Sequence, residues 1–75
     1  MSLEQKTTSE LIQLATVGGG FHLNATSRRT EELIQIAAAA SEKGCQVYFA
    51  GISNRPIEKL LQIASAGKGS VVFVD

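Results

Sequence analysis

Two similar segments, TSRRTEE and SNRPIEK, carry arginines beside hydroxyl or amide side chains. Guanidinium groups bind phosphate and carboxylate through paired hydrogen bonds, and neighbouring polar side chains can complete such a site. Both segments follow expected strands and precede expected helices, which is where open parallel sheets bind ligands. The sequence therefore offers a candidate site for a phosphate ligand or a nucleic acid, made of Ser27, Arg28, Arg29, Asn54 and Arg55.

The same segments have an ordinary structural explanation. Ser27, Thr30 and Asn54 are residue types that cap helix N-termini, and loop arginines are often solvated or paired with acids. The acids that follow, Glu31 and Glu32, would repel an anion. Seven Lys and Arg residues balance seven Asp and Glu residues, so no overall field draws the chain to nucleic acid or an anionic membrane. Anion or nucleic-acid binding is therefore kept as the alternative function.

Catalytic groups are sparse in this chain. Cys45 and His22 are single residues of their kinds and fall on opposite faces of the expected strands, so they do not form a nucleophile and base. Ser27 lies beyond the end of the strand that holds His22, and no set of three or four metal ligands is present. Glycines such as Gly18 follow helices instead of preceding them, unlike a phosphate-binding loop. We expect a protein that is not an enzyme and needs no metal or cofactor.

One phrase occurs three times, as ELIQLA, ELIQIA and KLLQIA, beginning at Glu10, Glu32 and Lys59. Its apolar residues have the spacing of one helix face, shown best in the second copy by Leu33, Ile36, Ala37 and Ala40. Each phrase runs into glycine, which favours the left-handed conformation that ends a helix. The phrases therefore predict three helices that end at Gly18–20, at Gly44, and at Gly67 with Gly69.

After each glycine comes a run of β-branched and aromatic residues, at 21–25, 45–52 and 70–75. We therefore predict an α/β fold of three αβ repeat units, forming one domain over residues 1–75. Right-handed crossovers make the strands parallel. We prefer the strand order 1-2-3 with all helices on one face, because only one face of the strands is consistently apolar; the order 2-1-3 would need two.

The face away from the helices is expected to be bare. Aligning the strands places Tyr48, Val71 and Phe73 on it as an apolar patch, and the last strand lacks the proline or lysine that discourages edge pairing. The alternative is that the C-terminal end folds over, or that the patch is small and simply tolerated. We expect a non-catalytic interaction or self-assembly module, a homodimer that uses the open sheet face or the C-terminal edge strand.

Length and composition are consistent with this picture. A chain of 75 residues with 44% hydrophobic and 19% charged residues folds, but with a thin margin of stability. The one cysteine cannot form an internal disulfide, and no signal sequence or membrane-spanning stretch is found, so a cytoplasmic location is expected. One helix and one strand per unit resembles leucine-rich repeats, but the LxxLxLxxN frame is absent, so no family is assigned.

Overall fold

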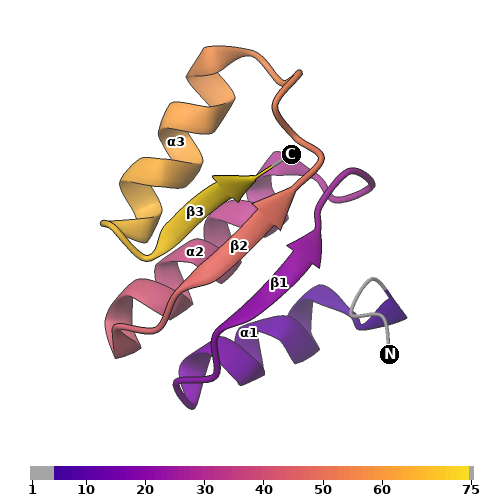
Figure 1. The fold of residues 1–75 in the computed structure, drawn as a ribbon. Helices are drawn as coiled ribbons and strands as arrows, with labels where there is room; N and C mark the ends of the chain where they lie inside the picture. The colour runs from indigo at the N-terminus through magenta and orange to yellow at the C-terminus, as the bar shows by residue number, and fades with distance from the viewer. Residues whose placement is uncertain (1–4, 75) are drawn as a thin grey trace.

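The computed structural model describes residues 5–74, which form helices and strands in alternation. Their order is α1 (Thr8–Thr16), β1 (Phe21–Asn24), α2 (Thr30–Lys43), β2 (Val47–Ala50), α3 (Ile57–Gly67) and β3 (Val71–Val74). The strands are parallel in the order β1-β2-β3, and the helices lie behind one face of the sheet (Figure 1). The predicted α/β fold with strand order 1-2-3 is therefore confirmed.

The acid of the repeated phrase fixes where α1 and α2 begin. The N–H of Glu10 donates to Thr7 Oγ1 at 3.1 Å, and the N–H of Thr7 donates to Glu10 Oε1 at 2.9 Å. This reciprocal pair satisfies two of the donors that a helix start leaves without a partner. At α2 the carboxylate of Glu32 accepts the N–H of Arg29 at 3.1 Å. The glutamate that opens the first two phrases therefore acts as a start signal for its helix; the third phrase opens with Lys59, and α3 has no such contact.

The helices α2 and α3 end at glycines in two different ways. Gly44 caps α2 in the left-handed conformation at φ 71°, as predicted. α3 also ends at Gly67, as predicted, but Gly67 is not its left-handed cap: Lys68 takes that conformation, at φ 49°. A Cβ on Gly67 would lie 2.5 Å from Cγ2 of Val71. Gly67 therefore supplies room, which lets β3 pass close to the end of α3.

The pairing of β1 with β2 differs by two residues from the sequence alignment. Phe21 pairs with Val47 and Leu23 with Phe49, whereas the alignment placed Leu23 beside Val47. A shift of two keeps every side chain on its predicted face, because strand side chains alternate in direction. Leu23, Val47 and Phe49 are accordingly buried beneath the helices.

The pairing of β3 with β2 differs by one residue, which reverses the faces of β3. Val71 pairs with Val47 and Phe73 with Phe49, and residues paired in a parallel ladder share a face. Both therefore lie on the helix-covered side of the sheet edge, where Phe73 is still 38% exposed. The prediction that Val71 and Phe73 lie on the open face is wrong.

The open face next to Tyr48 is occupied by Val72. A run of four apolar residues has no alternation, so its sequence pattern does not set which residues face the core. Packing decides the register instead, because Val71 fits against Gly67 and joins the edge of the core.

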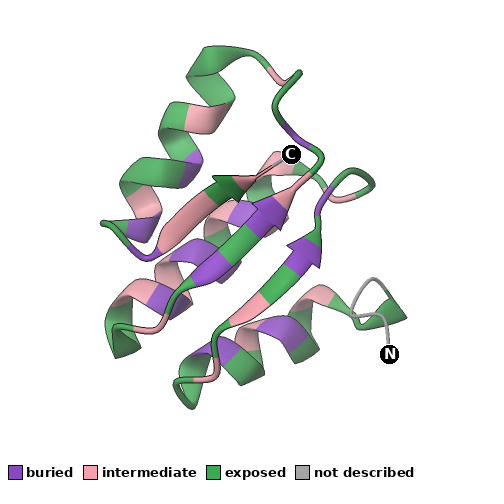
Figure 2. Ribbon diagram, in the orientation of Figure 1, coloured by how far each residue is buried: buried purple, intermediate pink, exposed green. Residues whose placement is uncertain are grey.

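The core lies between the sheet and the helix layer, where Figure 2 shows the buried residues. Its fully or almost fully buried residues are Leu11, Ala15, Leu23, Ala25, Leu33, Ile36, Ala37, Ala40, Val47, Phe49, Ile52 and Ile63. The central helix α2 supplies four of them, because it packs against both α1 and α3. Burying each large apolar side chain contributes about 1.5–3 kcal/mol.

The open face of the sheet is mixed in character. His22, Asn24, Gln46 and Tyr48 are exposed there. The rings of His22 and Tyr48 are stacked, with centroids 6.4 Å apart and planes inclined by 15°. Val72 and Val74 add aliphatic surface on the same face, in place of the predicted Val71 and Phe73.

Candidate interaction site

Two arginines of the candidate anion site, Arg28 and Arg55, form hydrogen bonds inside the fold. Arg28, in the loop before α2, donates from Nη1 to Thr8 Oγ1 at 3.0 Å and from Nη2 to the carbonyl oxygen of Lys6. Thr8 is the first residue of α1. The guanidinium group therefore ties the loop of the second unit to the helix start of the first.

Arg55 repeats this arrangement one unit later. Its Nη1 donates to Thr30 Oγ1 at 3.0 Å, and its Nη2 donates to the carbonyl oxygens of Ala25, at 3.0 Å, and of Arg28. Thr30 is the first residue of α2, as Thr8 is of α1. We call these two contacts the arginine staples. Each staple joins one unit to the unit before it through a charge-assisted hydrogen bond.

The other predicted members of the anion site do not join the staples in one place. Ser27 and Asn54 are exposed loop residues, and the helix N-caps are Arg29 and Pro56, so the capping explanation for Ser27 and Asn54 is also wrong. Arg29 is exposed and lines a hollow between α1 and α2. Arg28 and Arg55, both half-buried, are directed toward different helix starts.

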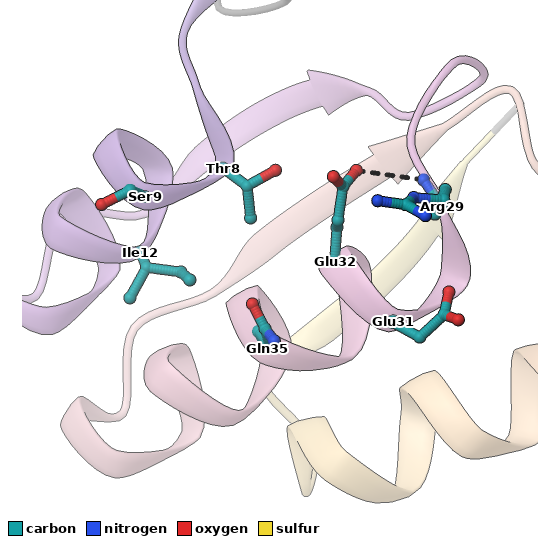
Figure 3. A pocket seen from close by; sticks show the side chains of 7 residues that line it. All are labelled: Thr8, Ser9, Ile12, Arg29, Glu31, Glu32 and Gln35. Atoms are coloured by element: carbon teal, nitrogen blue, oxygen red, sulfur yellow. Dashed lines mark hydrogen bonds between the residues drawn. The ribbon is translucent and has the colours of Figure 1, made fainter.

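The hollow beside Arg29 has a volume of about 580 Å³ and is shown in Figure 3. Its lining is Thr8, Ser9 and Ile12 from α1, with Arg29, Glu31, Glu32 and Gln35 on the α2 side. Two carboxylates accompany the single guanidinium group, and Glu32 already accepts the N–H of Arg29. This balance of charge does not favour an anion.

The carboxyl ends of β1 and β2 are closed by internal hydrogen bonds. Asn24 Oδ1 accepts from the N–H of Thr26 at 3.1 Å and from its hydroxyl at 2.6 Å. The Thr26 hydroxyl also lies 3.3 Å from the carbonyl oxygen of Gly51. A Cβ on Gly51 would come within 2.3 Å of that hydroxyl oxygen. The carboxyl ends of the strands, where parallel folds often bind ligands, are therefore occupied by polar groups of the chain itself.

Cys45 and His22 lie apart, as their expected faces indicated. The Sγ of Cys45 is 3.6 Å from the carbonyl oxygen of Ala15 and packs against the core, while His22 is exposed on the open face. Within residues 5–74, no three His, Cys, Asp or Glu side chains gather closely enough to hold a metal ion.

The lining of the hollows shows which side of each helix meets its neighbour. Ile12 of α1 shares the larger hollow with Glu32 and Gln35 of α2, so this side of α1 meets α2. A smaller hollow on α1 is lined by Lys6, Glu10, Gln13 and Leu14. In the repeat, Glu10 and Gln13 align with Glu32 and Gln35. Each helix therefore has one side for the preceding helix and another for the following helix.

The side for the following helix carries equivalent residues in every unit: Thr8, Thr30 and Ile57; Ile12, Ile34 and Leu61; Ala15, Ala37 and Ala64. In α1 and α2 the alanines are fully buried and the isoleucines are half-buried. In α3, the last helix of the described chain, Ile57 is 64% and Leu61 60% exposed, and Ala64 is exposed as well (Figure 2). We call Ile57, Leu61 and Ala64 the α3 stripe.

Sequence reasoning missed the α3 stripe, although the signal was available. The alignment of the repeats shows that Leu61 occupies the position of Ile12 and Ile34, and α3 has no following unit in residues 5–74. A position that faces a neighbour in one unit must be bare in the last unit of a stack.

No helix in the described part of the chain is long and apolar enough to cross a bilayer. Comparisons with protein families, with curated proteins and with solved structures give no match.

Proposed function

We propose that this chain is a non-catalytic self-assembly module that associates with a second copy through its C-terminal end. The observation that carries the proposal is the exposure of the α3 stripe, whose equivalents in α1 and α2 are buried or half-buried. Apolar surface of this kind, bare at one end of a stack, favours association.

The edge strand β3, which follows α3, also supports association at this end of the molecule. The N–H of Val47 donates to the carbonyl oxygen of Ser70 at 2.8 Å, so the main-chain polar groups of Ser70 face β2. Because these groups alternate along a strand, those of Val71 and Phe73 point away from β2, toward the edge. An apolar edge strand with outward-facing N–H and C=O groups attracts a partner.

The alternative of anion or nucleic-acid binding is less well supported. Arg28 and Arg55 use their guanidinium groups on main-chain carbonyls and threonine hydroxyls, and acidic side chains accompany Arg29. A ligand would have to compete with these internal partners.

Sedimentation equilibrium of the purified chain, from about 10 μM to about 1 mM, tests the proposal. A contact based on one short helix is smaller than a standard interface, so we expect a weak dimer with a dissociation constant on the order of 100 μM. Leu61→Lys should abolish the dimer, because it places a charge on the stripe. The matched control, Tyr48→Lys on the open face, should leave the dimer intact.

Two results would contradict the proposal. One is a monomer over the whole concentration range. The other is a dimer that Tyr48→Lys abolishes and Leu61→Lys does not, because that pattern assigns the interface to the open sheet face.

A further inference from the structure

A second copy can cover the α3 stripe in two ways, which differ in symmetry. In the first, α1 of the next copy lies against α3 and continues the stack head to tail, which generates a ring or a filament. In the second, α3 of the partner lies antiparallel against α3 about a two-fold axis, which generates a closed dimer. The charges beside the stripe distinguish the two arrangements.

The head-to-tail arrangement can be examined through the contacts inside the chain. The second residue of each helix is exposed: it is Ser9 in α1, Glu31 in α2 and Glu58 in α3. Ser9 of α1 lines the same hollow as Glu32 of the next helix. By alignment, the residue that corresponds to Glu32 on the helix after α2 is Lys59, which therefore lies opposite Glu31. For Glu58 it would be Glu10 of the next copy, so two carboxylates would meet at positions where the chain itself has an acid opposite a hydroxyl or an amine.

The head-to-tail arrangement also lacks the arginine staple. Inside the chain each staple ends on the hydroxyl of the first helical residue, Thr8 or Thr30. In α3 that residue is Ile57, which offers no hydrogen-bond acceptor in its side chain. The C-terminal end is therefore poorly adapted to another unit of the same kind.

The two-fold arrangement brings together groups that attract one another. Ile57, Leu61 and Ala64 have the 4-3 spacing of a helix seam, and Lys68, which caps α3 at its C-terminal end, follows four residues after Ala64; all four are exposed. Antiparallel pairing centred between Leu61 and Ala64 places Leu61 against the partner's Ala64. It also brings Lys68 to the level of the partner's Ile57, whose side chain the lysine stem can cover. The ammonium group then lies beside the partner's Glu58.

From this complementarity we infer that the α3 stripe docks against the α3 stripe of a second copy, antiparallel, with Glu58 of each chain paired to the partner's Lys68. This inference depends on the proposed function, because it specifies the geometry of the same association. The two symmetry-related ion pairs close the dimer at both ends of the seam, so association stops at two chains.

A charge exchange tests the geometry. Sedimentation equilibrium is measured for the full chain and for Glu58→Lys, Lys68→Glu and the double variant. Each single variant should weaken the dimer about five-fold or more, because both symmetric pairs become repulsive. The double variant should recover most of the affinity. Helical circular dichroism and the urea midpoint establish that each variant is folded.

A second set of variants tests the competing geometry. Glu10→Lys changes the charge on α1 that only the head-to-tail arrangement would bring near Glu58. In the two-fold dimer it should leave the dissociation constant unchanged. Tighter association of Glu10→Lys, or species larger than a dimer that Leu14→Lys removes, would overturn the inference in favour of head-to-tail stacking.

The outcomes for the inference and for the proposed function are distinct. A dimer that Leu61→Lys abolishes, but that shows no recovery in the double charge variant, overturns the antiparallel geometry and leaves self-assembly standing. A chain that is monomeric at about 1 mM overturns both.

Discussion

Arg55 donates from Nη1 to the hydroxyl oxygen of Thr30 at 3.0 Å, which joins the loop before α3 to the first residue of α2. Arg28 makes the same contact with Thr8 one unit earlier. The arginine in the loop after β1 and the one in the loop after β2 are thus internal connectors between units. Removing such a connector should therefore lower the stability of the fold.

Arg55→Ala should lower the free energy of unfolding by about 2–3 kcal/mol, because it removes charge-assisted hydrogen bonds from a half-buried group. Urea denaturation followed by circular dichroism measures the change. Arg55→Lys should recover only part of the loss, since an ammonium group cannot reproduce the fork of the guanidinium group. The matched control is Arg29→Ala, an exposed neighbour, which should change stability by less than about 0.5 kcal/mol. Equal losses for both variants would contradict the staple.

The register of β3 predicts opposite responses at adjacent residues. Val71→Asp should destabilise the fold by several kcal/mol, on the order of the cost of placing an unpaired charge at the core edge. Val72→Asp, on the open face beside Tyr48, should cost about 1 kcal/mol or less. Comparing the urea midpoints of the two variants tests the register of β3. A larger loss at Val72 would instead support the face assignment that came from the sequence alignment.

Gly20 and Gly44 should tolerate substitution differently. A Cβ on Gly20 would lie 2.3 Å from the main-chain oxygen of Gln46, so Gly20→Ala must move backbone and should cost about 1–3 kcal/mol. Nothing lies within 4 Å of a Cβ on Gly44, where only the positive φ matters. Gly44→Asn should therefore be mild, because asparagine accepts the left-handed conformation. Thermal melts of the two variants provide the comparison, and a milder effect at Gly20 would be evidence against the close approach of the two chain segments.

The capping carboxylate of α1 should make stability depend on pH. The N–H of Thr7 that Glu10 accepts, with a smaller contribution from Lys6, lowers the pKa of Glu10 below its usual value. Because the folded pKa is lower than the unfolded one, this stabilisation is present above the unfolded pKa and is lost as the pH falls through the folded pKa. Glu10→Gln should therefore be less stable than the parent at neutral pH, and the difference should narrow in acid. Urea midpoints at about pH 7 and about pH 3 test this, and a constant difference would contradict it.

Much of the fold could be predicted from the repeated phrase. The helix spacing around Leu33 and the glycine that follows at Gly44 gave the second helix and its end, and the apolar face of the strands gave the one-sided helix layer. The register of β3 could not be predicted, because Val71 to Val74 is apolar throughout and only the space at Gly67 decides which side faces inward.

The candidate site was predicted less well, for a related reason. Arginine beside a hydroxyl suits a phosphate as well as it suits a neighbouring loop, and composition cannot distinguish the two. Arg28 and Arg55 find their partners in helix starts far away in sequence, which only the three-dimensional arrangement supplies. The α3 stripe was overlooked because Leu61 has the same residue type as buried positions elsewhere.

The isoleucine at the start of α3 has a consequence for engineering. Ile57 is the point where the unit-to-unit connection stops, since Thr8 and Thr30 accept a staple and Ile57 cannot. A designed tandem array could be lengthened by restoring threonine at this residue and appending a copy of the second unit, whose arginine would then find its acceptor. Threonine at this residue, together with the appended unit, would continue the unit-to-unit connection beyond α3.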